Sequence, residues 1–147
     1  MSGLRLNLLE QGRATEWLTS FVLLGFAFTL SLPGSTLSGA SFRAFTEIGT
    51  DDATVAFPLA VLAAMRMCAL FINGNWKRSP ILRMIGAIIG SAVFAMLSMA
   101  FYWPTLAYGA PVSTGVSAYF ILAAFDALSA YRSGADVRLG QQLSSRT

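Results

Sequence analysis

Four long apolar runs, separated by short polar segments, make up most of the chain. They cover about residues 16–32, 54–73, 81–103 and 112–131. A helix needs roughly 20 apolar residues to cross the hydrocarbon core of a bilayer, and the first run is near the lower limit. Pro33-Gly34, Asn73-Gly74 and Gly109-Ala110-Pro111 supply the breaks between runs. The pattern predicts an all-α fold: an integral membrane four-helix bundle, forming a single transmembrane domain over residues 1–147.

A shorter amphipathic pattern lies between the first two runs. Within residues 41–48, the apolar side chains Phe42, Phe45 and Ile48 recur every third position. This spacing is compatible with a short interfacial helix lying on the membrane surface. An ordinary ordered loop explains the segment equally well, so both interpretations stay open.

The basic residues predict the orientation of the bundle. With four crossings, eight of them fall on one side of the membrane and only Arg43 falls on the other. Cytoplasmic loops carry the excess of Lys and Arg, so both termini are expected in the cytoplasm, with Lys77, Arg78 and Arg83 in a basic cytoplasmic loop. The full set of eight is Arg5, Arg13, Lys77, Arg78, Arg83, Arg132, Arg138 and Arg146.

Two charged residues of opposite sign stand inside the apolar runs. Arg66 lies in the second run and Asp126 in the fourth, each six or seven residues from its cytoplasmic end. At 1.5 Å per residue both lie roughly 10 Å inside the same face, on helices of the same direction. Charges at bilayer depth need pairing or hydration, so we expect a structural ion pair. The alternatives are a polar or ion pathway, Arg66 reaching the headgroups, and Glu16 as its additional partner.

Gly86 and Gly90 form a GxxxG motif in the third run. Small residues at this spacing let membrane helices approach closely, which predicts helix packing here. The packing partner is either another helix of the same chain or, in a homo-oligomer, a second copy.

The composition argues against most catalytic functions. The chain is 55% hydrophobic and only 12% charged, against about a quarter charged in soluble domains. It has no histidine, and its carboxylates and single cysteine have no metal-ligand spacing. Cys68 lies in an apolar run and is expected to be a buried, unreactive thiol. We expect no enzyme, no metal and no cofactor. The basic residues lie at segment ends, which predicts contact with the lipid bilayer and no nucleic-acid binding.

One segment resembles a known group of proteins. It contains Arg66, an apolar stretch, Asn73-Gly74-Asn75-Trp76, basic residues and Ser79-Pro80. This order resembles small uncharacterised multi-span membrane proteins of tailed bacteriophages and prophages. The pairs Glu16-Trp17 and Thr114-Gly115, followed by Asp126, stand in a similar order. The resemblance implies the inner membrane of a bacterial host as location and assigns no catalytic or ligand-binding residue.

These observations favour a non-enzymatic membrane protein that acts by assembling in the host membrane, with itself or with other membrane proteins. A holin-like lysis protein that forms a membrane lesion is the first alternative. A small channel or transporter subunit, with Arg66 and Asp126 lining the path, is the second.

Overall fold

The computed structural model describes residues 13–75 and 80–144, and this part of the chain is entirely helical outside its turns. The helices are α1 (Arg13–Leu30), η2 (Thr36–Ser38), η3 (Ala40–Phe42), α2 (Arg43–Glu47), α3 (Asp52–Asn75), α4 (Pro80–Tyr108) and α5 (Thr114–Ser144). The predicted all-α fold is confirmed. Lys77 and Arg78, assigned above to a basic loop, lie outside the described residues.

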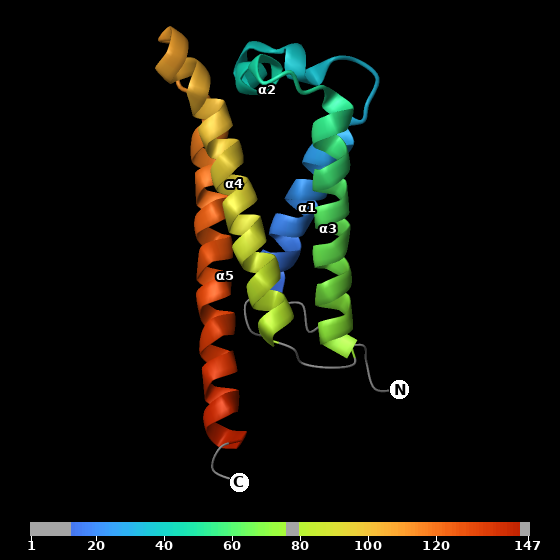
Figure 1. Ribbon diagram of the computed structural model, residues 1–147, viewed down its shortest axis with the longest axis vertical. Helices are drawn as coiled ribbons and strands as arrows, with labels where there is room; N and C mark the ends of the chain where they lie inside the picture. The colour runs from blue at the N-terminus through green and yellow to red at the C-terminus, as the bar shows by residue number, and fades with distance from the viewer. Residues whose placement is uncertain (1–12, 76–79, 145–147) are drawn as a thin grey trace.

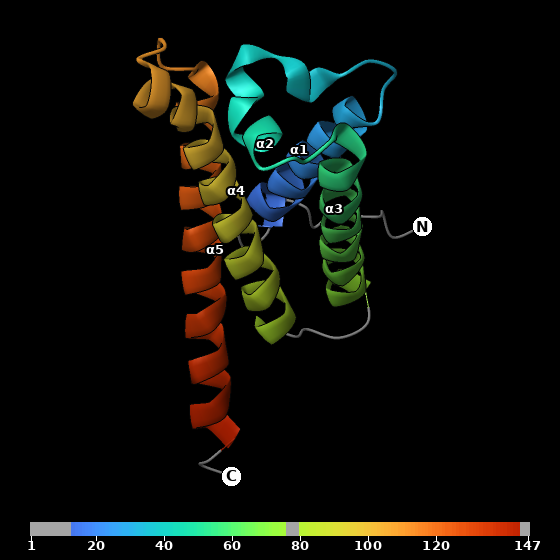
Figure 2. The ribbon, with the colours of Figure 1, turned by 45° about the horizontal axis from the view of Figure 1, so that its top comes forward.

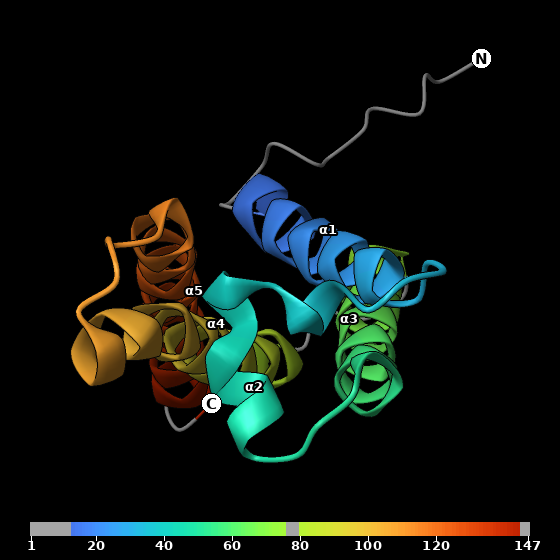
Figure 3. The ribbon, with the colours of Figure 1, turned by 90° about the horizontal axis from the view of Figure 1, so that it is seen from above.

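Three of the helices are long and apolar enough to cross a membrane. The apolar lengths are Asp52–Ile72 in α3, Ile81–Tyr108 in α4 and Thr114–Ala135 in α5. The apolar part of α1, Ala14–Leu30, is shorter, and Figure 3 shows α1 slanted across the view, whereas α3 and α5 are seen nearly end-on. The chain is therefore a multi-span helical membrane protein. Its described residues contain three full-length candidate spans, and its first apolar run forms a shorter, tilted helix.

The long helices alternate in direction. As Figure 1 shows, α1 and α4 begin, and α3 and α5 end, at the same end of the molecule, called the base here. The opposite end carries the short helices η2, η3 and α2, called the cap here (Figure 2). Helices α3 and α5 therefore run in the same direction, and both begin toward the end that is opposite the base.

The bundle consists of two helix pairs. Helix α1 packs mainly on α3, and α4 packs mainly on α5, whereas contacts between the pairs are sparse. One apolar cluster joins all four helices near the middle of the molecule. Its buried members are Leu23, Ala27, Leu59, Ala63, Phe94, Leu97 and Ala123. The pairs therefore meet at this apolar layer and at the polar residues on its base side.

Residues 41–48 are largely helical, as one of the two interpretations held, and they belong to the cap. The cap is one short α-helix preceded by two 3-10 turns rather than a continuous helix. Phe42 and Phe45 pack inward, and the Phe42 ring lies 5.0 Å from the ring of Phe101 on α4. Ile48 is 73% exposed. The Asp52 carboxylate ties the cap to α3 by accepting hydrogen bonds from the backbone N–H groups of Thr36 and Leu37.

The helix ends differ most from the expected boundaries at the ends of α4 and α5. Helix α4 continues past Trp103 to Tyr108, and Figure 1 shows it bending over its last turns. Pro104 lies in those turns, where its missing N–H explains the bend. Helix α5 starts at Thr114 and continues to Ser144, well past the end of the fourth apolar run at about residue 131. Its 31 residues span about 46 Å, and it projects beyond the other helices at the base.

The outer surface of the spans is apolar. Large side chains such as Phe57, Met65, Met96 and Phe120 are each more than 60% exposed. On a membrane helix this surface contacts lipid tails. Cys68 belongs to the same surface, so the expectation of a buried thiol was wrong. Its direction on α3 differs from that of Arg66, because residues two apart lie on different helical faces.

Candidate functional site: a buried charge network between the helix pairs

The structure brings Arg66 and Asp126 into direct contact. The Arg66 guanidinium donates from Nη1 to Asp126 Oδ2 at 2.7 Å and from Nη2 to Oδ1 at 3.0 Å. Arg66 is 5% exposed and Asp126 is 0% exposed. This two-pronged geometry is the strongest form of a guanidinium–carboxylate contact. Each charge is thus neutralised inside the bundle, and the Arg66 side chain points to Asp126 rather than to the lipid headgroups.

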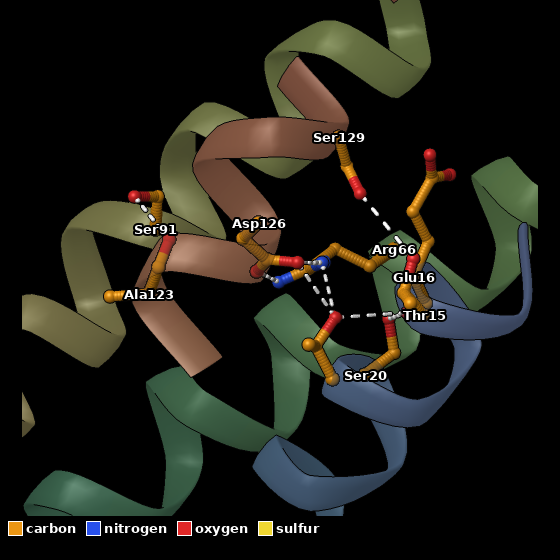
Figure 4. A network of polar contacts seen from close by, with 9 residues as sticks. Thr15, Glu16, Ser20, Arg66, Ser91, Ala123, Asp126 and Ser129 are labelled. Carbon is orange, nitrogen blue, oxygen red and sulfur yellow. Dashed lines mark hydrogen bonds and ion pairs between the residues drawn. The ribbon is translucent and has the colours of Figure 1, made fainter. Parts of the chain in front are cut away.

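Thr19 of α1 completes the ion pair. Its hydroxyl donates to Asp126 Oδ1 at 2.8 Å and accepts from Arg66 Nη2 at 2.9 Å. A single buried hydroxyl therefore serves both charges and brings a third helix to the site. Figure 4 shows the arrangement, with Asp126 and Arg66 approaching from opposite sides.

Gly90 of α4 provides the space in which the pair lies. A Cβ added there would overlap the Arg66 guanidinium and the Asp126 carboxylate. At Gly86 an added Cβ would meet only Arg66 Cγ, at an ordinary 3.8 Å. The GxxxG motif was expected to let two helix backbones approach. Instead its glycines face the Arg66 side chain, so α4 needs a gap at Gly90 for a charged group.

A second ion pair lies nearer the base. Glu16 of α1, 3% exposed, accepts from Arg83 Nη2 at 2.7 Å and from Arg83 Nε at 3.1 Å. Glu16, one of the alternatives named above as a partner of Arg66, thus pairs with Arg83 in this structure. Glu16 precedes Thr19 by nearly one turn of α1, so its carboxylate reaches Arg83 on α4 while Thr19 reaches Arg66.

The two ion pairs both cross the boundary between the helix pairs. The α1/α3 pair carries Glu16 and Arg66, and the α4/α5 pair carries Arg83 and Asp126. Each helix pair therefore presents one positive and one negative charge to the other. This arrangement stabilises one register of the two helix pairs, because sliding one helix pair past the other would break both ion pairs.

Hydroxyl side chains surround the charges on the base side of the apolar layer. Ser20 donates to the Glu16 carbonyl at 2.7 Å, and the Thr15 and Ser129 hydroxyls lie 3.5 Å apart (Figure 4). Ser133, 0% exposed, has no hydrogen-bond partner within the described part of the chain. On the cap side, the charges are followed by Leu23 and Phe94, which are fully buried. The charges are thus separated from the cap by an apolar layer.

The arrangement is better suited to holding the helix pairs together than to catalysing a reaction. Both arginines and both carboxylates are engaged with each other. Across residues 13–75 and 80–144, no three His, Cys, Asp or Glu side chains gather in a way that could hold a metal ion. A half-open pocket between α3 and α4, lined by Glu16, Arg66 and Arg83, adjoins the network.

Sequence reasoning found part of this site and missed the rest. Matched depth on parallel helices was enough to pair Arg66 with Asp126. The role of Thr19 was missed, although its position three residues after Glu16 places both on one face of α1. Arg83 was assigned to a cytoplasmic loop because basic residues at span ends usually mark topology. The structure places it in the first turn of α4, facing Glu16.

Comparisons with protein-family models, with curated proteins and with solved structures found no match to this chain.

Proposed function

We propose that this chain is a non-enzymatic membrane protein that acts by assembling in a bacterial inner membrane, with its own copies or with other membrane proteins. One observation supports this most: the membrane-embedded charges pair with one another inside the bundle and stabilise its packing. The remaining surface of the spans is apolar, which leaves lateral contacts in the membrane as the natural mode of action.

The ion pair is proposed to be structural rather than part of a transport path. A path for ions needs water or polar groups on both sides of the charged residues. Here the Arg66–Asp126 pair is buried, and fully buried Leu23 and Phe94 lie on its cap side. A channel subunit would need a rearrangement of this layer, and nothing in the packing favours one.

The source and orientation also belong to this proposal. The resemblance described above supports a phage or prophage protein located in the inner membrane of its host. The distribution of basic residues supports an orientation with the base, and hence both termini, in the cytoplasm.

Controlled expression in a bacterial host tests this proposal against a lysis role. We expect the membrane potential, followed with a voltage-sensitive dye, to stay intact while the protein accumulates in the inner membrane. A co-expressed endolysin should then remain confined to the cytoplasm. Abrupt loss of the potential followed by endolysin-dependent lysis would overturn the proposal in favour of a membrane-lesion former.

A matched variant makes this experiment interpretable. Met96→Leu changes an exposed side chain on the lipid-facing surface and should behave as the unmodified chain in accumulation and in potential. Crosslinking in the membrane then tests assembly: we expect products larger than the monomer. A chain that accumulates but remains monomeric and uncrosslinked to any other protein contradicts the assembly role.

A further inference from the structure

Helix α1 presents one face to the charge network and the opposite face to the outside of the bundle. Figure 3 shows α1 along one edge of the molecule, and Glu16 and Thr19 on its inward side reach the two ion pairs. Residues three or four apart lie on one side of a helix. A row at this spacing is exposed on the side away from the network. This row, called the α1 face here, consists of Leu18, Phe21, Gly25, Phe28 and Thr29.

Gly25 lies in the middle of the α1 face, and the described chain gives no reason for a glycine there. Apart from the backbone of α1, no atom of the described residues lies within 4 Å of where its Cβ would stand. Gly90 differs, because the Arg66–Asp126 pair fills the corresponding space. Glycine is a poor former of helix interiors, so an exposed glycine with open space beside it weakens α1 without a gain inside the chain.

The surface around Gly25 has the shape that membrane helices use to approach one another. Leu18, Phe21 and Phe28 are each more than half exposed, and the missing side chain at Gly25 leaves a notch between them. One turn later, the Thr29 hydroxyl donates to the Gly25 carbonyl at 2.9 Å, so its polar group is satisfied within the helix. Two small residues four apart let a second backbone come close.

The height of α1 is a separate observation that points to a protein partner on this side. Its apolar part, Ala14–Leu30, is about 25 Å long along the helix axis, and the slant of α1 lowers its height further. The hydrocarbon core is roughly 30 Å thick, and the apolar length of α3, Asp52–Ile72, matches it at about 31 Å. Lipid beside α1 must therefore thin, or another protein surface must cover the α1 face.

A second copy of this chain fits the α1 face better than a protein with only full-length spans. Such a protein would leave the difference in height in place, whereas a second copy presents an equally short face. A twofold axis along the membrane normal brings the same surface of both copies together, with Gly25 opposite Gly25. None of the five residues of the α1 face is charged, so this contact of like with like meets no repulsion.

We propose that the α1 face is the dimer interface of this chain, with the two α1 helices crossing at Gly25. Both ion pairs stay within each copy, because their residues lie on the opposite side of α1. The inference rests on the proposed assembly in the membrane, and it names the surface and the partner of that assembly.

Disulfide crosslinking in the membrane tests this interface with single cysteines. Phe21→Cys in a Cys68→Ser background places a thiol on the α1 face, one turn from Gly25. Met96→Cys in the same background is the control, because Met96 is 71% exposed on α4 and lies at a similar depth. With copper phenanthroline as the oxidant, we expect most of the Phe21→Cys chain to form a linked dimer and the Met96→Cys chain to stay largely monomeric.

Gly25→Leu, added to the Phe21→Cys chain, fills the notch. We expect at least about a tenfold fall in the linked dimer, as overpacking of a close contact predicts. Within one copy the leucine meets no neighbour and is the better helix former, so the unfolding temperature of the monomer in detergent should not fall. Ala95→Leu, an exposed site on α4, is the matched control and should leave the linked dimer unchanged.

Co-purification of two differently tagged copies measures assembly separately from its interface. Tagged copies that co-purify while Phe21→Cys links no more than Met96→Cys, or while Gly25→Leu leaves the link intact, would overturn the α1 face and leave the proposed assembly standing. A chain that crosslinks only to other proteins would do the same. Copies that neither co-purify nor crosslink to any protein would overturn the proposed function and this inference together.

Discussion

At the scale of single residues, Gly90 has the most constrained position in the network. It lies where the Arg66 guanidinium and the Asp126 carboxylate meet the surface of α4, and no larger side chain leaves room for both. Glycine in a helix interior costs about 1 kcal/mol relative to alanine. Here the loss of that helix propensity is offset by a buried ion pair that could not otherwise form.

Gly90→Ala should therefore destabilise the protein even though alanine is the better helix former. We expect a loss of about 1–3 kcal/mol, typical of overpacking a buried site. Gly86→Ala is the matched control, because its Cβ would make only ordinary contact with Arg66. Thermal unfolding in detergent, followed by circular dichroism, measures both. Equal behaviour of the two variants would show that Gly90 does not hold the pair.

Thr19 allows a second test at this scale. Thr19→Val keeps the side-chain shape but leaves Arg66 and Asp126 each short of one buried hydrogen bond. We expect a loss of about 1–3 kcal/mol in the free energy of unfolding. Thr29→Val, an exposed site on the same helix, should change it by less than about 0.5 kcal/mol. A Thr19 variant as stable as the Thr29 variant would remove Thr19 from the network.

The residue scale also shows where sequence reasoning stops. Depth along a helix follows from counting residues, and this was sufficient to pair Arg66 with Asp126. The direction of a side chain around its helix depends on how four helices pack, which counting does not give. Hence counting left Glu16 open as an alternative partner of Arg66, whereas the structure pairs it with Arg83. Likewise, small residues at Gly86 and Gly90 predict close approach but not whether a backbone or a side chain approaches.

At the scale of elements, the cap is held to the bundle by polar contacts of Glu47 at the end of α4. Its carboxylate accepts from Trp103 Nε1 at 2.7 Å and from the Tyr108 hydroxyl. The Arg43 guanidinium lies over the Tyr108 ring, 4.4 Å from its centre. The amphipathic spacing of residues 41–48 indicated a short helix, but these partners come from another span, about sixty residues later.

This contact should respond to pH. Hydrogen bonds from Tyr108 and then Trp103 lower the pKa of Glu47 below its usual value of 4.5. Its stabilising effect is therefore present above pH 4.5 and is lost as the pH falls through the lowered pKa. Trp103 emission, in a Trp17→Phe/Trp76→Phe background, should change in that acid range. Glu47→Gln is the control and should show no such transition; the same transition in that variant would assign it to another group.

At the helix termini, some contacts are between near neighbours in the sequence and others are with distant elements. Asp51 caps the start of α3 by accepting from the Thr54 backbone N–H at 2.7 Å, a short-range pattern visible in the sequence. Asp52 bonds instead to the start of η2, which the sequence does not reveal. The continuation of α5 to Ser144 was also missed, because a polar composition after residue 131 is compatible with both a helix and a tail.

At the scale of the whole molecule, complementary charges and one apolar layer join two helix pairs. Sparse contacts between the pairs make the buried bonds important, because few other interactions fix how the pairs sit together. The four apolar runs predicted a bundle from the sequence alone. They did not predict the division into pairs, which arises from packing between helices distant in the sequence.

A double-mutant cycle on Arg66→Ala and Asp126→Ala tests the central claim most directly. Each single variant leaves one unpaired buried charge and should lose about 3–5 kcal/mol of unfolding free energy in detergent. The double variant leaves none, so its loss should fall well below the sum of the single losses, by roughly 2 kcal/mol or more. Two single losses that simply add, or single variants as stable as the unmodified chain, would contradict an ion pair that holds the bundle together.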